Sequence, residues 1–141
     1  MDVTASLAIS SSALQAQRLR MDVIAANLAN AQSTRTPEGG PYTRRDVVLE
    51  ALPGGSFDDV LGAQPGGAVR VARVEEDDAP PRVVFDPGHP DADAQGYVAY
   101  PNVNPITEMV DLMAATRAYE ANVAAVNATK RVLEAALSIG R

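Results

Sequence analysis

The sequence predicts an α+β fold in which long helices at both ends of the chain flank a small β-rich module. All ten prolines lie between Pro37 and Pro105, and nine of the ten glycines lie between Gly39 and Gly96. Because proline and glycine interrupt helices and favour turns, the two ends can form unbroken helices while the middle turns repeatedly. The predicted segments are an N-terminal helix in residues 1–31, a β module in 32–103 and a C-terminal helix in 104–141.

The first segment is expected to be helical from about Ala5 to Ala31, with apolar side chains recurring every seven residues along one stripe. The stripe consists of Leu7, Leu14, Met21 and Leu28. A second apolar zone, which includes Ile9 and Val23, lies on the opposite side. Two interpretations of these two faces remain open: the helix lies within an ordinary domain core, or it is buried between subunits. We favour the second.

The last segment carries helix signals at both ends. Asn104 and Pro105 provide an N-cap and a first helical residue, Glu108 lies near the positive end of the helix, and Gly140 closes the other end. Between them, apolar residues alternate at intervals of three and four, as in a coiled-coil seam. The predicted packing residues are Met109, Leu112, Tyr119, Val123, Val126, Leu133 and Leu137, with Thr116 and Lys130 as the weaker positions. Alanines surround this seam and allow neighbouring helices to approach from several directions.

The middle of the chain is predicted to form short strands separated by turns. Four segments have the valine content or the alternation expected of strands. They are residues 43–51, 68–74, 82–85 and 96–100. Turn residues follow or separate them at 53–55, 65–67, 80–81 and 87–88. The acidic run at 75–78 is expected to be a solvated loop or strand end.

The free energy of pairing the two helices within one molecule is expected to be marginal. Closing the loop of about seventy residues between them costs roughly 4 kcal/mol. Burying a leucine-sized side chain contributes about 1.5 to 3 kcal/mol, but the second faces of both helices would remain in water. We therefore expect the ends to be loose in the free monomer and ordered in an assembly.

Composition excludes several classes of function. The net charge is −6 and the two ends are balanced, so the acidic excess lies in the middle, which argues against nucleic acid as a partner. There is no cysteine, hence no disulfide or thiolate site. The chain lacks the glycine pattern of a phosphate-binding loop, and no cofactor is expected. We expect neither a cleavable secretory signal nor a membrane-spanning segment.

One cluster invites a chemical interpretation, the segment from Asp86 to Asp93 with the only histidine, His89, among three carboxylates. Imidazole and carboxylate groups are suitable metal ligands, but the spacing matches no standard site. Two prolines and a glycine make a rigid turn the simpler interpretation. No catalytic residue is predicted, because no serine lies in a nucleophile-elbow pattern and His89 has no recognisable triad partners.

Several motifs at the two ends resemble one family. Residues 11–31, with Asn27-Leu28-Ala29-Asn30 as their core, closely resemble the N-terminal signature of bacterial flagellar rod and hook proteins. Residues 34–42, 96–105, 108–113 and 117–122 resemble the proximal-rod members of that family. Residues 57–84 carry little that can be matched. Asn27 and Asn30 are expected either to end the helix by bonding to exposed backbone groups or to contact a neighbouring subunit, and both roles stay open.

The resemblance implies a structural role. Members of this family are exported without cleavage by the flagellar type III export apparatus. They polymerise helically into the rod, which crosses the periplasm and transmits torque for motility. The implied partners are copies of the chain itself, other rod subunits, and the membrane ring and rod-adaptor proteins of the basal body. The alternatives are another axial rod subunit, a secreted coiled-coil effector or adhesin, and a metalloenzyme that uses the 86–93 loop.

Overall fold

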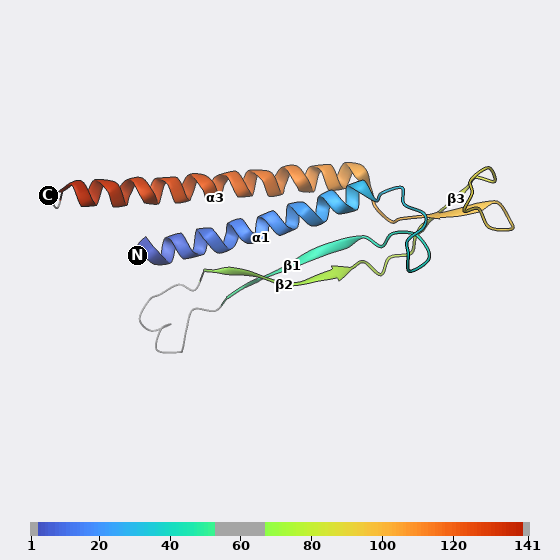
Figure 1. Cartoon of the computed structure of the whole chain (residues 1–141), viewed down its shortest axis with the longest axis horizontal. Coiled ribbons are helices and arrows are strands. Elements are labelled where there is room, and N and C mark those ends of the chain that lie inside the picture. The colour runs from blue at the N-terminus through green and yellow to red at the C-terminus, as the bar shows by residue number, and fades with distance from the viewer. Residues whose placement is uncertain (1–2, 53–66, 140–141) are drawn as a thin grey trace.

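The computed structural model describes residues 3–52 and 67–139, and these form two long helices and four strands (Figure 1). The elements are α1 (Val3–Ala29), β1 (Arg45–Ala51), β2 (Val69–Glu76), β3 (Arg82–Phe85), β4 (Tyr97–Tyr100) and α3 (Pro105–Ile139). The α+β class and the four strands predicted from the sequence are confirmed. Gly140 and the predicted turn at 53–55 lie outside the described residues, as does most of the turn at 65–67.

The two helices lie side by side, and α3 extends past the beginning of α1 because it has 35 residues against 27 (Figure 1). Asn104 starts α3 as predicted. Its side-chain Oδ1 accepts the backbone N–H of Ile106 at 3.0 Å, and its carbonyl accepts the backbone N–H of Glu108 at 3.0 Å. Pro105 follows at the first helical position, where the missing N–H removes no helical hydrogen bond.

Strands β1 and β2 form an antiparallel sheet that lies along α1, on the side away from α3 (Figure 1). Val48 pairs with Arg73 whereas Leu49 pairs with Val71, so Ala72 is an extra residue that makes a β-bulge. Ser12 of α1 ties the sheet to the helix, because its Oγ accepts the backbone N–H of Val69 at 3.0 Å. The molecule therefore has three layers: α3, α1 and the sheet.

Strands β3 and β4 form a separate antiparallel hairpin beyond the end of the helix pair at which α3 begins (Figure 1). The rings of Phe85 and Tyr97 meet edge to face at 5.3 Å between centroids. Gly96, just before β4, has a φ of +84°. A Cβ there would lie 2.9 Å from Phe85 Cε2, so both the backbone and the ring demand glycine.

The apolar core is thin. Among residues 3–52 and 67–139, the buried hydrophobic residues are Ala16, Ile24, Ala31, Val47, Val98, Val103 and Ala115. The largest side chains exposed by less than 2% include Glu108 and Asn27, which are polar. The alanine-rich helices thus pack closely but bury little apolar surface, and a polar cluster occupies the most enclosed position. Neither helix in the described part of the chain is long and apolar enough to cross a membrane.

Candidate functional site

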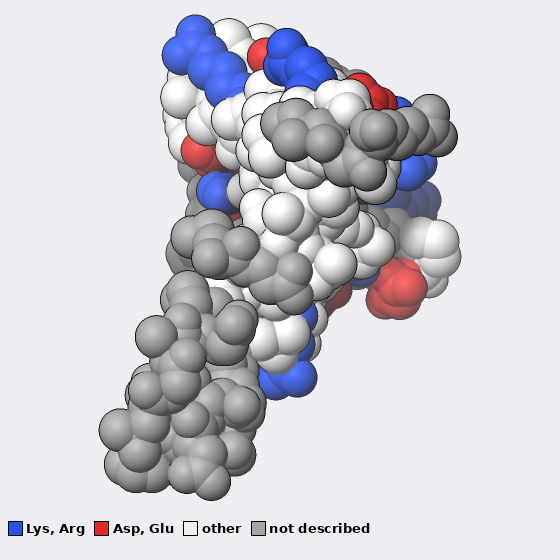
Figure 2. All heavy atoms as spheres, turned by 90° about the vertical axis from the view of Figure 1, so that its left-hand side faces the viewer, with Lys and Arg blue, Asp and Glu red and all other residues white. Residues whose placement is uncertain are grey.

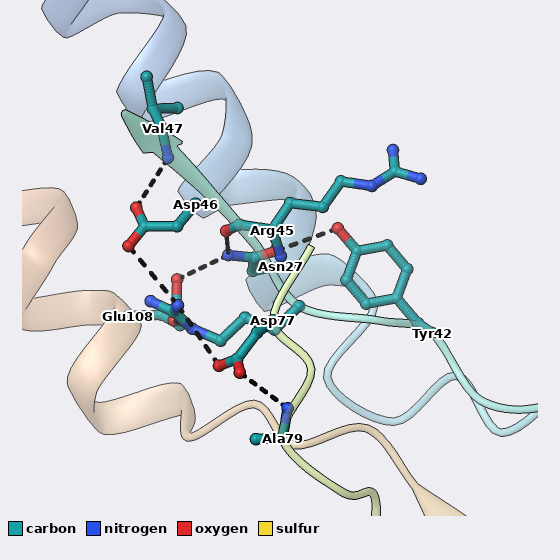
Figure 3. Close-up of polar contacts among 9 residues, drawn as sticks. Asn27, Tyr42, Arg45, Asp46, Val47, Asp77, Ala79 and Glu108 are labelled. Atoms are coloured by element: carbon teal, nitrogen blue, oxygen red, sulfur yellow. Dashed lines mark hydrogen bonds and ion pairs between the residues drawn. The ribbon is translucent and has the colours of Figure 1, made fainter. Parts of the chain in front are cut away.

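A polar cluster that is buried at Asn27 and Glu108 joins the end of α1, the start of α3 and the start of β1 (Figure 3). We call this cluster the polar anchor. Its members are Asn27, Tyr42, Arg44, Arg45 and Glu108. Asn27 comes from the last turns of α1, Glu108 from the first turn of α3, and the other three from the segment that enters β1. The polar anchor therefore fixes where the helix pair ends and the strands begin.

Asn27 is 0% exposed, and its side-chain amide makes four hydrogen bonds within the chain. Nδ2 donates to the carbonyl of Arg45 at 2.7 Å and to Glu108 Oε2 at 3.1 Å. Oδ1 accepts the backbone N–H of Arg45 at 3.0 Å and the Tyr42 hydroxyl at 3.0 Å. Two donors and two acceptor sites are the full capacity of an amide. Asn27 thus pairs with the backbone of Arg45 as a neighbouring strand would.

Glu108 is 1% exposed and is neutralised by Arg44. Arg44 Nε donates to Glu108 Oε1 at 2.7 Å, while its Nη1 lies 3.8 Å from Asp46 and 3.9 Å from Asp77. Burial acts to lower the pKa of the Arg44 guanidinium, but the hydrogen bond and charge of Glu108, helped by Asp46 and Asp77, outweigh it and hold the pKa above its usual value. The buried carboxylate is therefore paired and hydrogen-bonded, as a buried charge must be.

Tyr42 closes the polar anchor on its outer side. Burial raises the pKa of its phenol above the ordinary value of 10.0; nearby Arg45 lowers it, whereas Glu108 and Glu76 raise it further. The phenol therefore stays protonated and donates a hydrogen bond to Asn27 Oδ1.

The sequence predicted a role for Asn27 but not for the acid that it contacts. Glu108 was expected only to favour the positive end of α3. Glu108 lies seven residues before Ala115 and hence on the same helix face, but only the structure shows that this face is buried and that a carboxylate there needs a partner. Asn30 instead ends the helix. Its Nδ2 donates to the carbonyl of Ala26 at 2.9 Å, and its Oδ1 accepts the Ser33 hydroxyl at 3.1 Å.

The predicted packing residues differ in exposure. Those that are partly buried are Leu7, Leu14, Met21, Leu28, Leu112, Tyr119, Val126 and Leu133. Met109, Val123 and Leu137 are exposed by 46%, 36% and 72%. Thr116 contacts α1 through its hydroxyl, 3.6 Å from Met21 Sδ. Four of the seven predicted packing residues of α3 are therefore partly buried in the single chain, and three are exposed to solvent. Their role between subunits stays a prediction.

Solvent also reaches large apolar residues at the start of α3. Ile106 is 71% exposed, Val110 54% and Met113 55%, and with Met109 they occupy positions separated by three and four residues. Such spacing places them on one helix face. Figure 2 looks from the opposite end of the helix pair, at which α1 begins, and there basic and acidic side chains lie along the α3 side of the molecule. An outward apolar face on a helix indicates a binding surface.

The 86–93 loop is a turn with partners inside the chain. His89 Nδ1 accepts the backbone N–H of Asp91 at 3.1 Å, and the imidazole ring lies edge-on to Tyr100. Asp91 accepts the Thr34 hydroxyl at 2.8 Å and lies 3.6 Å from Arg35. Within the part of the chain that the structure describes, no group of three or more His, Cys, Asp or Glu side chains could hold a metal ion.

Two family models match the ends of the chain. Residues 7–35 match the flagella basal body rod protein family, and residues 94–139 match the C-terminal region of the flagellar basal body rod FlgEFG proteins. These two ranges contain α1 from Leu7 onward and all of α3, including Asn27 and Glu108 of the polar anchor.

Similar proteins cover nearly the whole chain. The flagellar basal-body rod protein FlgC of Bacillus subtilis is 49% identical, over 96% of this chain and 97% of its own length. This chain belongs to the FlgC family of flagellar basal-body rod proteins. FlgC of Borreliella burgdorferi is 42% identical over 99% of the chain and 98% of its own length, and FlgC of Salmonella typhimurium is 43% identical over 94% of each. The similarity to FlgC thus extends across the middle of the chain, where motifs alone gave little resemblance.

Proposed function

We propose that this chain is a non-catalytic structural subunit of the proximal flagellar basal-body rod, and that it polymerises through its terminal helices. The observation that carries the proposal is the exposed apolar face of α3. The sheet covers α1 on the side away from α3, while Ile106, Val110 and Met113 stay in solvent. Membership of the FlgC family supports a rod as the assembly that covers them.

The mechanism follows from how the helices are held. A rod that transmits torque must resist shear between subunits, and helices that interlock with those of neighbouring copies form a continuous layer that does so. Contacts that do not close on themselves extend such a layer into a filament. The polar anchor would keep the strands fixed to each helix pair while the layer bears load.

The partners and location belong to the same proposal. The chain would contact copies of itself, other rod subunits, and the membrane ring and rod-adaptor proteins. It would reach the periplasm-spanning rod through the flagellar type III export apparatus, without a cleaved signal peptide. Neither an enzymatic activity nor a nucleic-acid partner is part of the proposal.

Electron microscopy of basal bodies tests the function. A strain that lacks the gene should swim no longer and should yield basal bodies without a complete rod, and the full-length chain should restore both. Intact rods in the deletion strain would contradict the proposal.

A pair of variants tests the outward face of α3. Val110→Asp should abolish swimming, because a charge would be buried without a partner when α3 meets a neighbour. The purified variant should keep the helical circular dichroism of the unchanged chain, since Val110 is 54% exposed. Gln32→Asp, which adds the same charge at an exposed residue after α1, is the control and should leave swimming normal. Normal swimming with Val110→Asp would show that this face is not covered in the rod.

A further inference from the structure

The β3–β4 hairpin has an open edge along β3. All four residues of β3 are exposed, and within the described part of the chain β3 contacts β4 but no other helix or strand. An edge strand presents backbone N–H and C=O groups that can pair with another strand. The hairpin lies beyond the end of the helix pair, so the helices do not cover this edge (Figure 1).

The hydrogen bonds of the hairpin show which backbone groups of β3 face outward. The backbone N–H of Asp86 donates to the carbonyl of Gly96 at 2.9 Å, so these two residues form a hydrogen-bonded pair. In an antiparallel ladder, the residues of a strand alternate between bonding to the partner strand and turning their backbone groups away from it. Val84 therefore bonds toward β4, whereas the N–H and C=O groups of Val83 and Phe85 point outward.

The side chains along this edge are complementary to those of a reversed copy. Residues 82–86 begin with a base, Arg82, and end with an acid, Asp86, with apolar residues between them. Neither Arg82 nor Asp86 takes part in an ion pair among residues 3–52 and 67–139. Val83 and Phe85 are 61% and 62% exposed. An antiparallel second copy would place base opposite acid at both ends and apolar residues opposite each other between them.

We propose that two free copies of this chain pair along β3, antiparallel, about a two-fold axis at Val84. Val83 then lies opposite Phe85 of the second copy, and Arg82 lies opposite its Asp86. Each Val83–Phe85 pair exchanges two backbone hydrogen bonds, because both residues turn their N–H and C=O groups outward. Aromatic and β-branched side chains that lie directly opposite each other stabilise the pairing further. The two hairpins thereby form one four-stranded sheet.

The flanking prolines favour this register over its neighbours. A shift of two residues in one direction places Phe85 opposite Pro81 of the second copy, and a shift in the other direction places Val83 opposite Pro87. Proline has no backbone N–H, so either shift loses hydrogen bonds. Both shifts also separate the bases from the acids. A shift of one residue would set outward-facing backbone groups against groups that already bond to β4.

The pairing belongs to the free chain. In Figure 1, β3 runs nearly along the direction of the helices, so antiparallel strands direct the helices of the two copies opposite ways. A two-fold contact closes after two copies, whereas a filament repeats one contact and keeps all copies in the same direction. The pair must therefore separate before a copy joins a rod. The inference goes beyond the proposed function, and swimming is not its readout.

Sedimentation of the purified full-length chain tests the pairing. The unchanged chain should form a dimer whose share rises with protein concentration. Arg82→Asp alone and Asp86→Arg alone should each weaken dimerisation by about tenfold or more, because like charges then face each other at both ends. An equimolar mixture of the two variants should dimerise again, since every charge then faces an opposite one. A single chain that carries both substitutions should also dimerise.

Arg18→Asp is the matched control, because it makes the same change of charge at an exposed residue of α1. Its dimerisation should equal that of the unchanged chain. A chain that stays monomeric at every concentration would overturn the inference. So would a dimer that persists in Arg82→Asp or Asp86→Arg, or one that is lost equally in the control, because the contact would then lie elsewhere.

A single cysteine tests the register, and the chain has no cysteine of its own. At the two-fold axis, Val84→Cys places two thiols in a non-hydrogen-bonded pair with Cα atoms about 4.5 Å apart, which is within reach of a disulfide. Dissolved oxygen, as the oxidant, should link Val84→Cys copies at least about tenfold faster than Val83→Cys copies, whose thiols do not face each other. Equal rates, or faster linking of Val83→Cys, would overturn the register.

Discussion

At the scale of single residues, Asn27 connects α1 to β1 through the backbone N–H and C=O of Arg45. The sequence indicates a role for Asn27 because this residue lies in the segment that resembles the rod and hook family. Bonding to exposed backbone groups is one of the two roles that the sequence predicts for it. Tyr42, Arg44 and Glu108 could not be assigned to it from the sequence, because the contact between Asn27 and Glu108 joins residues 81 positions apart. In the charge balance of the sequence, Arg44 is only one of several basic residues in the acidic middle of the chain.

Replacing Asn27 should destabilise the chain more than replacing Asn30. Asn27→Ala leaves the part-buried N–H and C=O of Arg45 and the Tyr42 hydroxyl without this partner and removes one hydrogen bond from Glu108, which keeps Arg44. We therefore expect the free energy of unfolding to fall by roughly 2 to 4 kcal/mol. Asn30→Ala removes bonds at a less buried helix end and should cost about 1 kcal/mol or less. Urea denaturation of the purified variants measures both. Equal losses would mean that the polar anchor contributes no special stability.

Tyr42 should make stability depend on alkaline pH. Its pKa in the folded chain is raised above 10.0, so the folded state keeps the phenolic proton that the unfolded state releases. The contribution of this phenol to the free energy of unfolding is present in full below a pH of about 10 and is lost as the pH rises through the pKa of Tyr42 in the folded chain. Tyr42→Phe should therefore show a smaller fall in unfolding free energy between pH of about 9 and 11 than the unchanged chain. The same fall in both proteins would contradict this assignment.

At the scale of elements, periodicity and turn residues predicted the helices and strands well. Their partners were harder to predict. The predicted seam of α3 is rotated relative to the face that α1 covers, because Ala115 and Glu108, which heptad reasoning passes over, are the most buried residues there. Ala16 of α1 is similarly buried. Small residues allow the closest approach of two helices, while larger neighbours stay at the rim. The bulge at Ala72 likewise has no local sequence signal.

The β3–β4 hairpin provides a matched pair of glycines. Gly96→Ala should disrupt the hairpin, because an L-residue is strained at a φ of +84° and its Cβ would approach Phe85 to 2.9 Å. Gly88→Ala should be tolerated, since its Cβ would lie 3.6 Å from the nearest atom, Asp86 Oδ1. Hydrogen exchange of the Asp86 amide, which donates to the Gly96 carbonyl at 2.9 Å, reports the effect. Unchanged protection of this amide in Gly96→Ala would contradict the prediction.

At the scale of the whole molecule, the three layers are unequal. The sheet covers α1, whereas α3 has one neighbour and an outward face with large apolar residues. The sequence indicated two apolar faces on the terminal helices, and this is why it predicted an assembly. It could not indicate which face each partner takes, because that choice depends on long-range contacts such as the polar anchor. The order of the helices in the free monomer stays a prediction.

Cryo-electron microscopy of isolated basal bodies, with side-chain density in the rod, tests the central claim most directly. We predict that Ile106, Val110 and Met113, which are exposed in the single chain, are buried against a neighbouring subunit of the rod. A rod in which this face of α3 remains in solvent would contradict the claim.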